Sequence, residues 1–138
     1  MLLKCEKLRG TGNMIEFDVE AHDLSSCFCW PTKYLYRLYK MKHGNQFLLY
    51  ESPEIRGPSP NFGHVKTNEK KLCNNNENYE IYLHVLKYHE AVAPTLYGST
   101  TFTVGQLVKG KNNLFITDTN GNRNGTVTIR NIKRYTRH

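Results

Sequence analysis

An all-β fold, in the form of a β-sandwich, is predicted by three features of the sequence. Short segments alternate between apolar and polar residues with a period of two, which is typical of strands with one buried face. Turn-forming clusters of Gly, Pro and Asn separate these segments, and no segment has the pattern of a long helix. The chain has 138 residues, of which 38% are hydrophobic, and this suits a single globular domain with a packed core.

The alternation is clearest in the first predicted strand, where Ile15, Phe17 and Val19 share one face and acidic residues occupy the other. We expect strands, in chain order, over residues 14–21, 34–41, 47–50, 80–88, 99–108 and 126–132. Loops are expected where strand-breaking residues gather, at 57–60, 74–76, 93–94 and 119–122. No internal repeat divides the chain, so these strands are expected to build one core.

Positive charge is the main feature of the composition, with a net charge of +7 and a sequence pI near 9.3. Basic blocks at residues 31–72 and 101–138 alternate with mildly acidic blocks at 1–30 and 73–100. Blocks that are distant in sequence can share a face of a folded domain. The charge therefore favours anionic partners, namely acidic lipid headgroups, nucleic acid or acidic proteins.

The N-terminal segment carries four charged residues between Lys4 and Arg9 and lacks the apolar stretch of a signal peptide. No window approaches the roughly 18 apolar residues of a membrane-spanning helix. We expect a cytoplasmic protein, peripheral to a membrane. The four cysteines match neither a zinc site nor a dense disulfide framework, so we expect them to be reduced.

Several motifs in order resemble those of a C2 domain, and in the second half of the chain those of copine C2 domains. They are His22-Asp23-Leu24, Tyr34-Leu35-Tyr36, Ser59-Pro60-Asn61-Phe62, Leu72-Cys73-Asn74-Asn75, the strand from Ile81 to Lys87, Leu96-Tyr97-Gly98, the segment from Phe102 to Val108, and Gly125-Thr126-Val127-Thr128-Ile129. The resemblance implies an eight-stranded antiparallel β-sandwich of two four-stranded sheets that serves as a lipid-binding or protein-binding module. It spans residues 14–134, with residues 1–13 as an N-terminal extension and residues 135–138 as a basic C-terminal tail.

The C2 family binds calcium through carboxylates in its first and third loops, and this chain departs from that pattern. No Asp or Glu lies between Leu24 and Tyr50, and the family's Asp-Pro pair falls on Thr32 and Lys33. In the third loop the acidic pair aligns with Tyr88 and Glu90, and the next acidic position falls near Pro94 and Thr95. Because calcium needs several anionic oxygen ligands, we predict no useful calcium affinity and no other cofactor, with Glu90 as a vestigial candidate ligand.

Two groups of residues are candidates for lipid binding. Phe28 and Trp30 in the first loop are suited to an interface at the headgroup level, and the alternative is that they cover the end of the core. The basic candidates are Lys33, Lys40, Lys42, Lys66, Lys70 and Lys71, with His89 gaining charge at acidic pH. Related domains bind phosphoinositides on a concave sheet whose basic positions align here with Tyr36, Leu38, Tyr50 and Ser52, and Lys40 and Lys42 continue that face of the strand.

The convergence of these lysines with the C-terminal residues Arg130 and Arg134 is what a single basic patch would require. On this basis we predict a non-catalytic module that binds anionic phospholipid membranes without calcium, since no nucleophile motif or phosphate-binding glycine loop is present. A protein-interaction module of a copine-like protein is the main alternative. Calcium-dependent lipid binding, and binding of single-stranded nucleic acid through Tyr34, Tyr36 and Tyr39, are less favoured.

Overall fold

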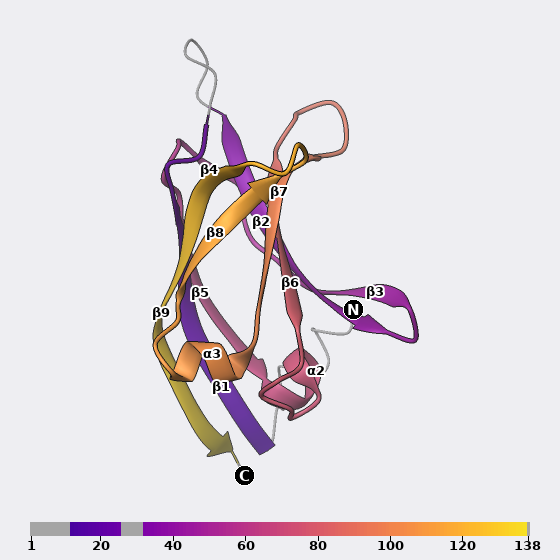
Figure 1. The fold of residues 1–138 in the computed structure, drawn as a ribbon, viewed down its shortest axis with the longest axis vertical. Helices are drawn as coiled ribbons and strands as arrows, with labels where there is room; N and C mark the ends of the chain where they lie inside the picture. Colours follow the sequence, from indigo (N-terminus) through magenta and orange to yellow (C-terminus); the bar gives the residue numbers. More distant parts are fainter. Residues whose placement is uncertain (1–11, 26–31, 138) are drawn as a thin grey trace.

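The computed structural model describes residues 12–25 and 32–137. This part of the chain forms strands and two five-residue helices (Figure 1). In chain order they are β1 (Gly12–His22), β2 (Lys33–Lys42), β3 (Asn45–Glu51), β4 (Ile55–Arg56), β5 (Asn61–Asn68), α2 (Glu69–Cys73), β6 (Ile81–Lys87), β7 (Thr95–Phe102), α3 (Val104–Val108), β8 (Asn113–Asp118) and β9 (Arg123–Arg137). The predicted all-β class is confirmed.

Eight strands follow one path in the order β3-β2-β6-β7-β8-β9-β1-β5, and the two-residue β4 pairs with β2 beside this path. Every ladder is antiparallel. The halves of the path are the two four-stranded layers of the predicted sandwich, but they form one strongly curled sheet because β7 and β8 pair over Gly98 and Ser99. A Cβ at Gly98 would lie 2.5 Å from Ile116 Cγ2, so this join requires glycine.

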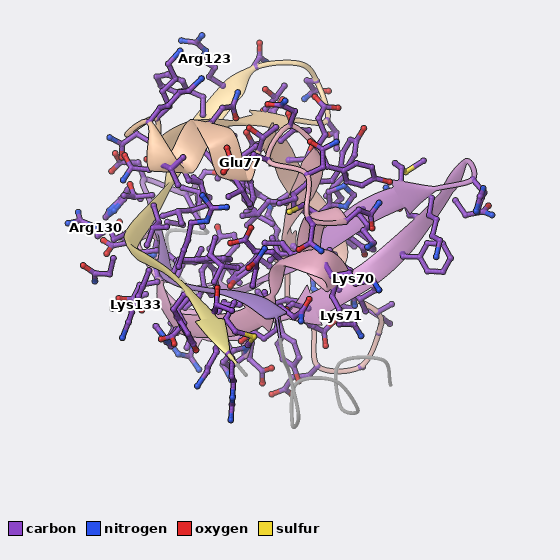
Figure 2. The ribbon with its side chains drawn as sticks, turned by 90° about the horizontal axis from the view of Figure 1, so that it is seen from below. Lys70, Lys71, Glu77, Arg123, Arg130 and Lys133 are labelled. Carbon is purple, nitrogen blue, oxygen red and sulfur yellow. The ribbon has the colours of Figure 1, made fainter. Side chains whose placement is uncertain are left out.

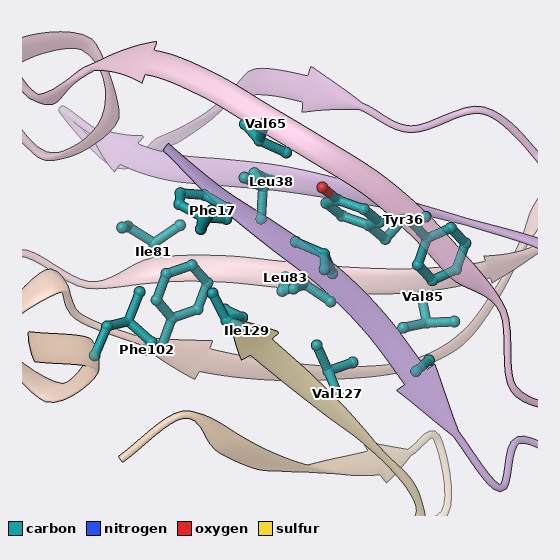
Figure 3. Close-up of a cluster of buried hydrophobic side chains, with 14 of the residues drawn as sticks. Phe17, Tyr36, Leu38, Val65, Ile81, Leu83, Val85, Phe102, Val127 and Ile129 are labelled. Atoms are coloured by element: carbon teal, nitrogen blue, oxygen red, sulfur yellow. The ribbon is translucent and has the colours of Figure 1, made fainter. Parts of the chain in front are cut away.

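The core lies between the two layers (Figure 3). Alternate residues of β1, β6 and β9 point into it, as the period of two predicts, and these residues are fully buried: Ile15, Phe17, Val19, Ala21, Ile81, Leu83, Val85, Val127 and Ile129. From β2, Tyr36 and Leu38 join them, and Tyr36 packs edge-on against Phe62 with ring centroids 5.0 Å apart. The alternation of side chains between the two faces of each strand therefore decides which of them remain available to a ligand.

The structure differs from the sequence prediction at several elements: strands β5 and β8 lie outside the predicted strand segments, and β7 begins at Thr95 instead of residue 99. The strand expected over residues 99–108 ends at Phe102, because Thr103 and Gln106 form a capping box that starts helix α3. At the C-terminus, β9 continues to Arg137 and pairs with β1 down to Gly12, so residues 135–137, expected as a tail, extend the sheet instead.

The elongated molecule has two different ends (Figure 1). At the loop end, the end of β1 and the start of β2 meet the connections after β4 and β6, through bonds from Leu24 N–H to Pro58 O and from Tyr88 N–H to Lys33 O. At the helix end lie α2 and α3, joined through a bond from Gly105 N–H to Glu77 O. Strand β2 runs from one end toward the other, a span of about 30 Å for ten residues.

Candidate functional site: a lysine pocket at the helix end

The predicted lipid-binding residues fall into separate groups. Lys33, His89 and Glu90 lie at the loop end, and Lys66 lies on the solvent side of β5. Lys40, Lys42, Lys70 and Lys71 line one pocket at the helix end. Phe28 and Trp30 lie outside the described residues.

At the loop end, tyrosines fix the start of the first loop. Tyr97 Oη accepts a hydrogen bond from Ser25 N–H at 2.9 Å and donates to Asn124 O at 3.0 Å, and Tyr34 Oη donates to Ser25 O. Burial and the neighbouring Tyr97 raise the pKa of Tyr34 to about 12. The Tyr34 phenol is therefore neutral at physiological pH, and both phenols act as structural hydrogen-bonding groups.

The residues at the calcium positions of the resemblance do not fit a calcium ion. The Lys33 ammonium lies 5.6 Å from the centre of the Tyr88 ring, and His89 Nε2 lies 2.9 Å from Thr95 Oγ1. Glu90 is exposed. No three His, Cys, Asp or Glu residues come together as a metal site within residues 12–25 and 32–137. A hard divalent cation would find an ammonium and a phenol ring there instead of carboxylates.

Helix α2 is built by two asparagines that flank it. Asn68 caps its N-terminus by accepting from the N–H groups of Lys70 and Lys71, and Asn74 ends it in the left-handed conformation with φ of 58°. Leu72 and Cys73 are buried against the core. The polar side of this single turn therefore carries Lys70 and Lys71 toward the pocket.

The pocket has a volume of about 500 Å³ and lies between the β2–β3 hairpin and the segment from the end of β5 to Asn74. Its lining residues are Lys40, Lys42, Phe47, Leu49, Asn68, Lys70, Lys71 and Asn74. Lys40 and Lys42 are two apart on β2, so both reach the pocket from the same face of the strand. Strand pairing brings Phe47 opposite Lys40, which supplies an apolar wall. We call this site the lysine pocket.

Lys40 is the buried member of the lysine pocket, with only 8% of its surface exposed. Its ammonium donates to Asn74 Oδ1 at 2.8 Å and approaches Lys70 O at 3.5 Å. Burial, and the charges of Lys42 and Lys71, hold the pKa of Lys40 below its usual value. Among the described residues no carboxylate pairs with Lys40, Lys42 or Lys70, and the pocket lining contains none. The positive charges of Lys40, Lys42 and Lys70 are therefore concentrated at the site without a paired carboxylate.

Strand β9 presents the opposite arrangement. The Arg134 guanidinium binds both oxygens of the buried Glu69 carboxylate at 2.8 and 2.9 Å, and it binds Glu77 at 2.8 Å. These bonds raise the pKa of Arg134 above its usual value. Arg130 pairs with Glu20 at 3.0 Å. Arg130 and Arg134 are therefore paired with carboxylates of the protein.

The single patch that would unite lysines and C-terminal arginines does not form. Seen from the helix end, Lys70 and Lys71 lie on the other side of the molecule from Arg130 and Lys133 (Figure 2). Lys66 on β5 lies opposite Glu16 of β1 in the strand register, and Lys133 of β9 lies opposite Glu16 on its other side. Lys66 is not part of the lysine pocket.

The structure also shows that residues aligned with the basic concave face of related domains do not form an open binding surface here. Tyr36, Leu38 and Ser52 are buried on the inner side of the sheet. Lys40 continues that inner face and lines the pocket. The sequence analysis missed Phe47, Asn68 and Asn74 as pocket residues. The Asn-rich turn after α2 was recognised only as a strand breaker, and no local pattern connects Phe47 to α2.

Within the described part of the chain, no helix combines the length and hydropathy needed to cross a bilayer. Comparison with family models found no match, and comparison with curated proteins found none. Solved structures do match. The chain is similar to BON1-C2B, from the copine BON1, with a TM-score of 0.76, 10% identity, and coverage of 92% of this chain and 94% of that one.

A C2 domain of plant extended synaptotagmin 1, the one designated A, matches with a TM-score of 0.65 and 10% identity over 94% of this chain and 98% of that one. A further C2 domain structure matches with a TM-score of 0.57 and 13% identity over 91% and 96% of the two chains. Similarity at such low identity establishes the fold. The chain has a C2-like fold, as the resemblance in the sequence predicted.

Proposed function

We propose that this C2-like chain is a non-catalytic module that attaches peripherally to anionic phospholipid membranes in the cytoplasm without calcium. The observation that carries the proposal is the lysine pocket, where four lysines meet with no carboxylate in the lining. Near an anionic bilayer each basic residue contributes about 1 kcal/mol, so four converging lysines suffice for reversible attachment. Membrane association of this kind weakens with salt, since the surface potential decays over a Debye length.

Calcium independence is supported by the residues at the loop end. Lys33 and Tyr88 stand where the C2 resemblance expects carboxylates, and the Lys33 ammonium already supplies positive charge there. A fixed ammonium attracts the same headgroups that a bound cation would attract, but it needs no calcium to do so.

The loop end provides a second, weaker contact in this proposal. Phe28 and Trp30 contribute apolar area, and Lys33 and His89 contribute basic side chains. Lys33 and Lys42 lie at the two ends of β2, about 30 Å apart. We therefore assign the main electrostatic contact to the lysine pocket and not to the loops.

Cosedimentation with vesicles tests the proposal. The full chain should pellet with phosphatidylserine vesicles equally in calcium and in chelator, and should remain in the supernatant with phosphatidylcholine alone. Pelleting only in calcium would contradict the interpretation of Thr32, Lys33 and Tyr88. Calorimetric titration with millimolar calcium provides the direct check, and a saturable isotherm would refute calcium independence.

A protein-interaction module, copine-like in kind, is the second candidate. The observation that favours it is the edge strand β3, where Phe47 and Leu48 are 43% and 45% exposed on opposite faces. Binding of the chain to neither vesicles nor a labelled oligonucleotide would favour this candidate. Nucleic-acid binding has less support, because Tyr34 and Tyr36 are fully buried and cannot stack on bases.

A further inference from the structure

Strands β3 and β5 are the two edges of the curled sheet, and they differ in how well they are protected. An edge strand exposes unpaired backbone groups, which proteins usually block with lysine, proline or an irregular register. The β5 edge carries the exposed Lys66, and its register with β1 shifts. The β3 strand contains no lysine or proline, its register with β2 shifts only after Leu48, and residues 45–48 are all exposed. Within the described ranges no strand covers this edge, and the β2–β3 hairpin projects from the body of the sandwich (Figure 1).

The β2–β3 turn fixes which backbone groups of β3 face outward. Its two residues, 43–44, have positive φ values of 53° and 79°, as a type I′ turn requires. The residues that flank such a turn form a hydrogen-bonded pair, and here they are Lys42 and Asn45. Because hydrogen-bonded and non-hydrogen-bonded pairs alternate along an antiparallel ladder, the N–H and C=O groups of Gln46 and Leu48 point away from β2. These groups are available to an added strand.

The side chains beside the edge indicate the chemistry of such a strand. Phe47 lies on the face of the lysine pocket, and Leu48 lies on the opposite face. The Lys42 ammonium lies 5.8 Å from the centre of the Phe47 ring, so its positive charge reaches the edge itself. Among the described residues no carboxylate pairs with Lys42. An added strand therefore meets a cation on one face and an apolar side chain on the other.

A second copy of this chain does not suit the edge. Residues 33–51, which form the hairpin, include four Lys or Arg and one Glu, which gives a net charge of +3. The one carboxylate, Glu51, is already bonded to Arg37 at 2.6 Å. Pairing two β3 strands would bring two positively charged hairpins together, and like charges on neighbouring strands are destabilising. Charge complementarity therefore favours an acidic segment of a different protein.

We propose that the β3 edge binds an extended segment of another protein by strand addition, and that this segment alternates acidic and apolar residues. Its backbone bonds to Gln46 and Leu48. Its acidic side chains lie on the Phe47 side and bind Lys42, and its apolar side chains pack beside Leu48. The inference goes beyond the proposed membrane attachment and does not rest on it. It gives the protein-interaction candidate a defined surface and a defined class of partner.

The probe for the test is the peptide acetyl-Glu-Val-Glu-Val-Glu-amide, titrated into the full isotope-labelled chain without vesicles. Nuclear magnetic resonance follows the backbone amides of residues 45–48. Two N-methylated peptides separate strand addition from simple charge attraction. Methylation at a Val nitrogen removes a donor that faces β3, whereas methylation at the central Glu nitrogen removes a donor that faces solvent. A peptide with Lys in place of Glu tests the charge preference.

Variants of the chain test the same two contacts. Gln46→Pro removes an outward N–H donor and no bond to β2, and proline is compatible with an edge strand. Lys42→Gln removes the positive charge at the edge. Lys109→Gln, an exposed lysine after α3, is the matched control. Thermal unfolding checks that each variant is folded, and if Gln46→Pro does not fold, the methylated peptides test the same hydrogen bonds.

We expect the peptide to shift the amide signals of residues 45–48. Val methylation and Gln46→Pro should each weaken binding about fivefold, and Glu methylation should change it little. Lys42→Gln should also weaken binding about fivefold, whereas Lys109→Gln should leave it unchanged. Equal effects of the two methylations, equal binding of the Lys peptide, or no binding at millimolar peptide would overturn the proposal. Dimerisation of the chain alone through residues 45–48 would also overturn it, because the edge would then belong to a second copy.

Discussion

The lysine pocket and strand β9 both carry several positive charges, but they differ in whether carboxylates pair with those charges. In the pocket, Lys40, Lys42 and Lys70 have no carboxylate partner among the described residues. On β9, Arg134 binds Glu69 and Glu77, and Arg130 binds Glu20. Paired charges stabilise the fold and present little net field, whereas unpaired charges remain available to an anion. The net charge of +7 therefore does not show where positive charge is available to a ligand. The arginines of β9 contribute less to the basic surface than their number suggests, and the lysines of the pocket contribute more.

The largest effect should come from breaking the β9 pairing. Arg134→Ala leaves the Glu69 carboxylate buried at 3% exposure without its bidentate partner, so we expect a loss of about 3 kcal/mol in the free energy of unfolding. Denaturant titration measures this loss. The matched control is Arg130→Ala, whose half-exposed pair should cost less than about 1 kcal/mol. Equal losses for the two variants would remove the distinction between these ion pairs.

Reversing one pocket charge should affect binding and not folding. Lys70→Glu removes one positive charge and adds a negative one, so we expect binding to anionic vesicles to weaken by about 2 kcal/mol, a factor of about 30. Arg130→Glu, on the other side of the molecule, should weaken binding by less than about threefold. Flotation at low salt measures both. If the two substitutions act equally, net charge governs binding and the pocket does not.

Lys40 should differ from Arg134 in its contribution to stability. Its ammonium is buried near two like charges, and its neighbour Asn74 is exposed and can bond to water instead. We expect Lys40→Met to leave the free energy of unfolding unchanged or to raise it by up to about 1 kcal/mol, while headgroup binding falls. Denaturant titration beside a vesicle assay gives both values. A loss of stability as large as that of Arg134→Ala would show that Lys40 has a structural role.

The smallest effect concerns His64 on β5, whose ring bonds to two carboxylates of β1. Hydrogen bonds to Asp18 at 2.6 Å and to Glu16 at 2.9 Å raise the pKa of His64 above its usual 6.5. The stabilisation from charged His64 is therefore complete below pH 6.5 and is lost as pH rises through the raised folded-state pKa. Because half of the side chain is exposed, its size should be below about 1 kcal/mol.

His64→Gln should make stability less dependent on pH between about pH 6 and about pH 8, and a nuclear magnetic resonance titration of the His64 ring gives the pKa itself. A pKa at or below 6.5 would contradict the ion-pair geometry. His22, which pairs with Glu20 at 3.1 Å on the same face, serves as an internal comparison in the same titration.

Much of the fold could be predicted because the alternation of apolar and polar residues along a strand is a local property of the sequence. Ile15, Phe17 and Val19 alternate with acidic residues, and the structure buries all three. The predicted strand over 99–108 was wrong in its second half because a capping box at Thr103 competes locally with strand propensity. The similarity of the sequence to C2 domains was sufficient to predict the layers. It was insufficient to predict the β7–β8 join at Gly98.

By itself, the sequence determined the all-β class, the inward face of most strands, the excess of lysine and arginine, and the lack of carboxylates between Leu24 and Tyr50. These depend on residue type and on a period of two along the chain. Only the tertiary structure decided which cations meet. Lys40 and Lys70 are 30 residues apart in sequence, and they converge because strand β2 and helix α2 both border the lysine pocket. Arg134 reaches Glu69 across 65 residues and is neutralised there, because β9 pairs with β1 beside the same helix.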